Sequence, residues 1–130
     1  MVNIEDKNLR ARVVEYLQQF ITEKRLERLS EILQYRTRHV TVVLEDLFQA
    51  QNISAVLRTC DCYGVQDVHV IQHRNEFEAN KDISMGADKW LSIHEYPHSD
   101  HNVKDCIDRL HEQGYWVAAT LPDEKKRTIF

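Results

Sequence analysis

The sequence is poor in the residues that build flexible linkers, disulfide frameworks and membrane spans. Its 130 residues include three glycines, two prolines and three cysteines. So few glycines and prolines leave little room for a flexible linker. No apolar run approaches the roughly 18 residues of a membrane-spanning helix. We therefore expect neither a membrane protein, nor a disulfide-rich secreted scaffold, nor a disordered tail, nor a large multidomain enzyme.

The composition is that of an ordinary globular protein, with 42% hydrophobic and 29% charged residues. A chain of this length can bury a core without a disulfide or a metal ion. Charges are spread through positions 1–15, unlike a secretory signal peptide. Together with an odd number of cysteines, this predicts reduced thiols in a cytoplasmic protein.

The net charge of -4 argues against a generally basic nucleic-acid-binding protein. The charge is nevertheless uneven, with a balance of +2 over residues 1–39 and -6 over residues 40–130. A local basic patch can bind phosphates on an acidic protein, because screening confines each charge to about 8–10 Å. A solvated helix face is the simpler interpretation of the same charges. The basic side chains concerned are Lys24, Arg25, Arg28, Arg36 and Arg38.

Apolar residues with helical spacing alternate along the chain with short β-branched runs, which predicts an α/β fold. We expect a mostly parallel sheet of about four strands, preceded by two N-terminal helices. The expected helices cover 7–21, a stretch ending near Tyr35, 52–63, and a stretch from Ser99 or Asp100 to Gly114. The expected strands cover 40–44, 65–71, 91–96 and 115–121, and residues 73–89 form a loop with a helical turn near 85–90.

The loop after the first expected strand, residues 45–51, is the first place to look for a site. Ligands of parallel α/β sheets usually bind beyond the carboxyl ends of the strands. This loop leads into the helix at 52–63, whose apolar residues define one core face. Asn52 and Arg58 both point away from that face, which leaves them available to a ligand.

The segment 44–65, LEDLFQAQNISAVLRTCDCYGV, resembles the first signature motif of the SpoU-type tRNA/rRNA 2'-O-methyltransferases of the SPOUT superfamily. The helix at 25–35 is similar to the N-terminal helix of the family's enzymes that methylate a D-loop guanosine of tRNA, and the whole resemblance covers about residues 24–121. The segment departs from the family's motif at two positions. Gln51 stands where the family often has His, and Ser54 stands where it often has Gly. The residues that match the motif are Asn52, Arg58, Thr59, Asp61, Gly64 and Val65.

The resemblance implies S-adenosylmethionine-dependent 2'-O-methylation of a ribose in tRNA, or alternatively rRNA, by a homodimer. It also implies that Arg58 helps to deprotonate the ribose 2'-hydroxyl together with an RNA phosphate, while Asn52 positions the RNA. Since arginine is an unusual base, electrostatic stabilisation of the developing 2'-oxyanion is a simpler role for Arg58. The alternatives are structural: Asn52 as a helix N-cap, and Arg58 as a surface residue paired with Glu45 or Asp61.

The family has two further signature motifs, a glycine- and glutamate-containing loop and a Ser/Asn-rich stretch that builds the C-terminal trefoil knot. Neither motif has a match in this chain. The resemblance therefore implies that the chain contains no cofactor-binding residue and that the trefoil knot is missing. We expect an N-terminal helical, RNA-contacting extension at 1–38 and a truncated methyltransferase domain at 39–130. Such a chain is expected to be inactive by itself.

The family resemblance makes the basic residues candidates for contacts with tRNA phosphates. Such contacts give affinity without reading the base sequence. Two alternatives stay open: a non-catalytic RNA-binding module derived from such an enzyme, and a generic α/β domain with an accidental match. The RNA-contact candidates are Arg25, Arg28, Arg36 and Arg38.

Three other residue groups have structural interpretations. The histidines of HEYPHSDH, His94, His98 and His101, are read as loop residues, with a zinc site as the alternative. Cys60 is expected in the core. The tryptophans Trp90 and Trp116 are expected in the core or on a strand face rather than as base-stacking platforms.

Overall fold

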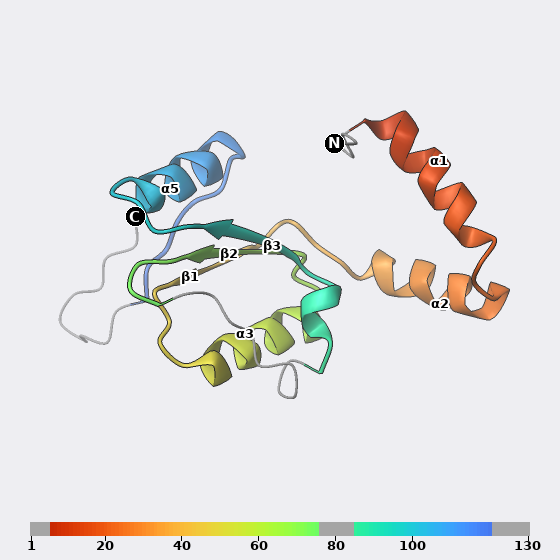
Figure 1. The fold of residues 1–130 in the computed structure, drawn as a ribbon, viewed down its shortest axis with the longest axis horizontal. Coiled ribbons are helices and arrows are strands. Elements are labelled where there is room, and N and C mark those ends of the chain that lie inside the picture. The colour runs from red at the N-terminus through yellow and green to blue at the C-terminus, as the bar shows by residue number, and fades with distance from the viewer. Residues whose placement is uncertain (1–5, 76–84, 121–130) are drawn as a thin grey trace. The chain divides into compact units, whose positions relative to one another are not determined.

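The computed structural model describes residues 6–75 and 85–120, and the chain divides into two compact units after Arg36 (Figure 1). The first unit holds α1 (Lys7–Gln18) and α2 (Glu23–Gln34). Each helix begins at a side-chain cap: Asp6 accepts the N–H of Asn8 at 2.9 Å, and Thr22 accepts the N–H of Arg25 at 3.3 Å. Two helices are therefore confirmed at the N-terminus.

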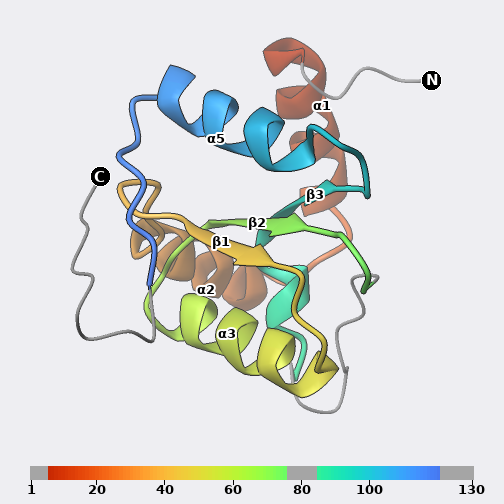
Figure 2. The same cartoon turned by 90° about the vertical axis from the view of Figure 1, so that its left-hand side faces the viewer.

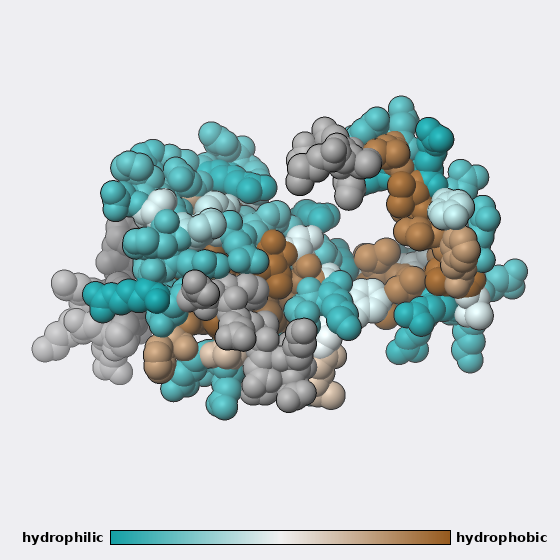
Figure 3. Space-filling view, in the orientation of Figure 1, coloured by the Kyte–Doolittle hydropathy of each residue, from teal (hydrophilic) through white to brown (hydrophobic). Residues whose placement is uncertain are grey.

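Neither helix of the first unit contains a buried residue. Apolar side chains recur along each helix at helical spacing, and they form a continuous brown stripe on this unit in the space-filling view (Figure 3). The stripe leaves large side chains in contact with solvent: Val13, Leu17, Phe20 and Leu33.

The second unit is a three-stranded sheet between two layers of helix (Figure 2). Its strands β1 (Val42–Glu45), β2 (Asp67–Ile71) and β3 (Ser92–Tyr96) pair in parallel, in chain order. One face is covered by α3 (Ala50–Cys62) with the short 3-10 helix η1 (Ala87–Lys89), and the other by α5 (Asn102–Glu112). The α/β class and the parallel sheet are thus confirmed.

Alternation along β2 divides the buried residues between the two faces, because successive strand side chains point to opposite sides. Val68 and Val70 join the cluster beneath α3, where Leu57 is fully buried. Ile71 joins the cluster beneath α5, around Cys106. Burying one side chain such as Leu57 contributes about 1.5–3 kcal/mol, so the core face of α3 holds this helix on the sheet.

A glycine ends each of the two helices that cover the sheet. Gly64 follows α3 with a φ of 73°, and Gly114 follows α5 with a φ of 85°. Both angles lie in the left-handed region, where a Cβ would clash with the carbonyl oxygen. The N–H groups beyond these glycines close the helices, with Val65 donating to the carbonyl of Cys60 and Tyr115 to that of Leu110.

The prediction of a fourth strand at 115–121 was wrong. Residues 115–120 form no strand, and Leu121 lies outside the described residues. The side chains do alternate as in a strand, with Tyr115 and Val117 packed on the cluster beneath α5 and Trp116 exposed. Tyr115 also donates its hydroxyl proton to the carbonyl of Arg38. Pairing with β1 would need a backbone ladder as well as this alternation, and β1 pairs with β2 alone among the described strands.

The expected start of α5 at Ser99 or Asp100 is also wrong. The helix begins after His101, whose side chain makes no capping hydrogen bond, and the Ser99 hydroxyl instead accepts the N–H of His101 at 3.4 Å. The buried Asn102 accounts for the shift, because its side-chain N–H groups donate to the carbonyls of Gln72 and Pro97. These bonds fix the helix start against the ends of β2 and β3.

Candidate functional site

Helix α3 presents the two central motif residues to solvent. Its buried side chains include Ile53, Leu57 and Cys60, which face the sheet. Asn52 and Arg58 are both exposed, as the helical pattern predicts. The helix thus separates a core face from a face that a ligand can reach.

Asn52 lies in the first turn of α3, but the N-cap interpretation is wrong. The cap is Gln49, and Asn52 donates its backbone N–H to the Gln49 carbonyl at 2.9 Å. The side chain of Asn52 is therefore free of a capping role and exposed at the positive end of the helix dipole. This end of a helix favours phosphate oxygens.

Arg58 lies six residues beyond Asn52, which is about 9 Å along the helix and about 120° around it. The expected alternative partners do not hold it, because Glu45 pairs with His73 at 3.2 Å and Arg58 has no ion pair within residues 6–75 and 85–120. The guanidinium, with five donors, is available to an anionic ligand. Asn52 and Arg58 thus offer two separate contacts on one exposed helix surface.

The loop between β1 and α3 is fixed by a clamp at Asp46, which the sequence analysis missed. Asp46 has a φ of 45°, and its N–H donates to the Ile71 carbonyl at 2.9 Å. Its Oδ1 accepts the N–H of Arg74 at 2.9 Å, and both the N–H and the Nδ2 group of Asn75 at 3.0 Å. The Asn75 N–H, above all, lowers the pKa of the Asp46 carboxyl. The available signal was an Asp directly after a strand, since Asp tolerates left-handed backbone.

The carboxyl edge of the sheet gathers further polar side chains. His73 follows β2 and contacts Glu45 at the end of β1, and its ring meets that of His98, after β3, edge to face at 6.3 Å between centroids. Gln72 donates to Glu95 at 3.0 Å. This is the edge at which ligands of parallel sheets usually bind, and the N-terminus of α3 opens onto it.

The four arginines predicted to contact RNA differ in exposure and in location. Arg25 and Arg28 are exposed on α2, and Arg36 is half-buried at the end of the same unit. Arg38 belongs to the second unit and is 69% exposed, with Nε at 2.8 Å from Oδ2 of Asp67. Asp67 begins β2, so Arg38 lies at the amino end of the strands and not at the carboxyl edge.

A buried polar cluster lies beneath α5, and no pattern in the sequence indicated it. His69 is 2% exposed and stacks on His94, with ring centroids 4.7 Å apart. Its Nδ1 is 3.1 Å from the hydroxyl of Tyr96, and His94 Nε2 is 3.0 Å from Asp67 Oδ1. Burial, followed by the charges of His94 and Arg109, lowers the pKa of His69 to about 4. His69 is therefore a neutral core residue near pH 7.

The predictions for the cysteine, the tryptophan and the histidines had different outcomes. Cys60 is buried at 3% exposure, as expected. Trp116 is 89% exposed and lies in no strand, so the expectation of a core or strand-face position was wrong. His94 lies within β3 against Asp67, and no group of three side chains able to hold a metal ion occurs in the part of the chain that the structure describes.

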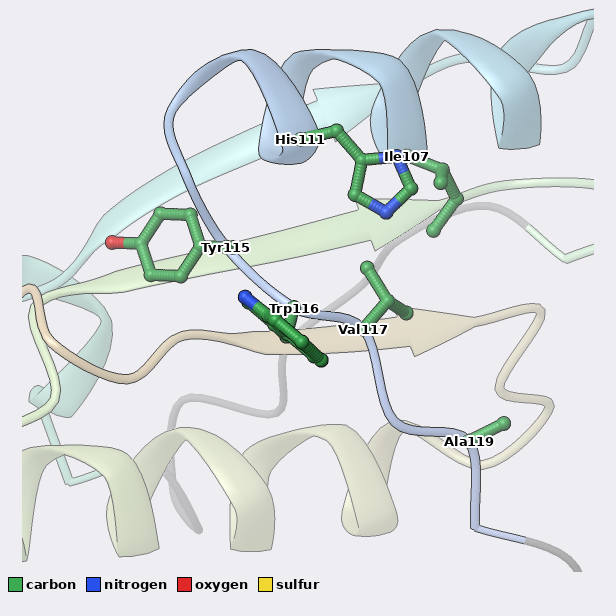
Figure 4. A pocket seen from close by; sticks show the side chains of 6 residues that line it. All are labelled: Ile107, His111, Tyr115, Trp116, Val117 and Ala119. Atoms are coloured by element: carbon green, nitrogen blue, oxygen red, sulfur yellow. The ribbon is translucent and has the colours of Figure 1, made fainter. Parts of the chain in front are cut away.

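The cavity beside α5 is a poor match to S-adenosylmethionine, the implied methyl donor. A cavity of about 530 Å³ lies between α5 and the segment that follows it (Figure 4). Its lining is mainly apolar and contains no carboxylate to receive the donor's ammonium and ribose groups. The walls of this cavity therefore do not fit the donor. The lining residues are Ile107, His111, Tyr115, Trp116, Val117 and Ala119.

The fold and the exposed face of α3 define an α/β protein with a candidate site at the carboxyl edge of a parallel sheet. Residues 39–129 match the SpoU rRNA Methylase family. The chain belongs to this family. None of the helices within the described residues is long and apolar enough to cross a membrane.

Individual relatives agree with the family. The chain is 41% identical over 109 residues to a tRNA (guanosine(18)-2'-O)-methyltransferase of Borreliella burgdorferi, covering 84% of this chain and 48% of the relative. It is 33% identical over 106 residues to a protein of the same name from Thermus thermophilus, covering 82% and 53%. The crystal structure of the A. aeolicus TrmH/SpoU tRNA modifying enzyme superposes with a TM-score of 0.67 at 28% identity, covering 79% of this chain and 51% of that one. The chain thus spans about half the length of these relatives.

Proposed function

We propose that the protein methylates a ribose 2'-hydroxyl of tRNA with S-adenosylmethionine as the donor, and that this chain supplies the RNA-facing side of the reaction. The observation that supports this is the exposed pair Asn52 and Arg58 on α3, directly after the first parallel strand, in a member of a methylase family. The names of the relatives favour tRNA over rRNA and guanosine 18 as the target.

Arg58 acts electrostatically in this proposal. A guanidinium stays protonated at any pH of interest, so it is a poor base and a good partner for developing negative charge. A phosphate oxygen of the RNA takes the 2'-hydroxyl proton, and Arg58 stabilises the oxyanion that remains. A preorganised donor at such a position is worth about 100- to 1,000-fold in rate.

Asn52 and the basic side chains bind the RNA. The Asn52 amide sits at the positive end of α3, where it contacts a phosphate or orders the loop before it. Arg25, Arg28 and Arg36 make residues 1–38 the RNA-contacting extension, and Arg38 joins them by exchanging Asp67 for phosphate. We further propose that the protein acts as a homodimer.

Two measurements test the proposal. In the first, binding of a tRNA transcript to the chain is followed by fluorescence anisotropy over a series of salt concentrations. The variant Arg25→Ala/Arg28→Ala removes two phosphate contacts and should lower the salt slope by roughly 1.4 to 1.8. Lys104→Ala is the matched control, because Lys104 is exposed but paired with Asp108 on α5. An unchanged slope in the double variant contradicts the RNA-contact assignment.

The second measurement follows methyl transfer to tRNA by a chimera that adds the remaining half of the Borreliella burgdorferi relative to this chain. Arg58→Ala should reduce turnover about 100- to 1,000-fold and leave tRNA binding unchanged. Arg58→Lys keeps the charge without the planar fork and should fall between. Near-normal turnover of Arg58→Ala would refute the catalytic role. A chimera that binds tRNA and transfers no methyl group would favour a non-catalytic RNA-binding module.

A further inference from the structure

Phe48 is a large aromatic side chain left in solvent at the candidate site. It lies in the loop between β1 and α3 and is 83% exposed. A single exposed apolar residue is normal on a protein surface and by itself indicates nothing. What distinguishes Phe48 is the backbone that presents it.

The loop around Phe48 is anchored on both sides. Before it, Asp46 is held by the chain after β2, and Leu47 packs against the core cluster beneath α3. After it, the carbonyl of Gln49 accepts the N–H groups of Asn52 and Ile53 at 2.9 and 3.3 Å. A rigid backbone presents an aromatic ring at little entropic cost, which is what a binding platform requires.

Phe48 lies at the carboxyl edge of the sheet, where the proposed function places the RNA. The loop joins the carboxyl end of β1 to the N-terminus of α3 (Figure 2). Phe48 precedes Asn52 by four residues, whereas the exposed Tyr63 lies at the opposite end of α3. A ring beside a phosphate-binding helix terminus can contact the base of the same nucleotide or of its neighbour.

We propose that Phe48 is a stacking platform for an unpaired nucleobase of the RNA substrate. This inference rests on the proposed function and adds a residue that the signature motif does not include. Proteins recognise single-stranded RNA through unstacked bases that lie against aromatic rings, whereas bases inside a duplex are not accessible to such a ring. Alanine substitution at a stacking position weakens binding by about 5- to 150-fold.

The test measures binding to the 130-residue chain by fluorescence anisotropy, with a tRNA transcript and a fully paired RNA duplex as probes. Phe48→Ala and Phe48→Leu should both bind tRNA about 5- to 150-fold more weakly, because leucine keeps the apolar volume without a ring. Phe48→Trp should bind as tightly as the unchanged chain. Tyr63→Ala is the matched control, since Tyr63 is 80% exposed, and it should leave binding unaltered. Binding to the duplex should be the same for all variants.

Urea unfolding of each variant separates binding from folding, and removal of an exposed ring should leave the midpoint unchanged. Equal tRNA affinity of Phe48→Ala and the unchanged chain overturns the inference while the proposed function stands. Full affinity of Phe48→Leu, or an equal loss on the duplex, overturns stacking on an unpaired base. Absence of tRNA binding by the unchanged chain contradicts the proposed function, and the inference fails with it.

Discussion

Replacement of His69 by phenylalanine should remove an acid sensitivity built into the second unit. His69 is buried between β2 and α5, where its neighbours are the rings of His94 and Tyr96 and the guanidinium of Arg109. Protonation would place a charge among these groups without water around it. The folded protein therefore resists protonation of His69, whereas the unfolded chain does not.

The magnitude follows from the difference between the two pKa values. The pKa of His69 is about 4 in the folded state against an ordinary value of 6.5. Because the folded pKa is the lower one, the unfolded chain binds more protons between these values, and stability falls as the pH drops from 6.5 to 4. The full loss across this window is about 3 kcal/mol, from about 1.4 kcal/mol per unit of pKa. Above pH 6.5 this contribution to the pH dependence vanishes.

The assay is urea unfolding at several pH values between 7 and 4, followed by the fluorescence of Trp90 and Trp116. His69→Phe should lower stability at pH 7 by about 1 kcal/mol, because the bond to the Tyr96 hydroxyl is lost. Across the acid window its stability should fall less steeply than that of the unchanged chain. His101→Gln, at an exposed position, should keep the original slope. Equal slopes for His69→Phe and the unchanged chain would refute the reasoning.

Three further outcomes are expected. Leu57→Ala should cost about 2–5 kcal/mol of unfolding free energy, since Leu57 is 0% exposed, whereas Leu33→Ala, at a 58% exposed position, should cost far less. Gly64→Ala should cost about 1–2 kcal/mol by urea unfolding, because φ is 73° there, and an unchanged midpoint would contradict the left-handed cap. Calorimetric titration of the chain with S-adenosylmethionine should show no micromolar binding, and a micromolar affinity would overturn the cavity argument.

Much of the fold was predictable because its signals are local. The helices α1, α2, α3 and α5 follow apolar spacing, and the terminating glycines mark two of their ends. The strands β1 and β2 follow runs rich in valine and isoleucine. On α3 the same periodicity showed that Asn52 and Arg58 avoid the core. Their roles in the reaction come from the family resemblance and remain proposals.

The prediction failed where the outcome depended on a distant partner. Residues 115–120 have the alternation of a strand, but alternation cannot supply a ladder with β1. Helix α5 begins later than predicted, after His101, because the Asn102 side chain donates hydrogen bonds to two carbonyls outside the helix. Trp116 was expected in the core or on a strand face, although its side of the segment faces solvent.

By itself, the sequence determined the order of helices and strands and the two faces of α3, because periods of 3.6 and 2 are properties of neighbouring residues. Only the tertiary structure decided that Asp46 clamps the loop before α3 and that His69 stays neutral within the core. Both outcomes require groups more than 20 positions away, Asn75 for Asp46 and Tyr96 for His69. The exposed ring of Phe48 becomes a candidate for function only when that clamp is seen, because rigidity of a loop is a property of its contacts.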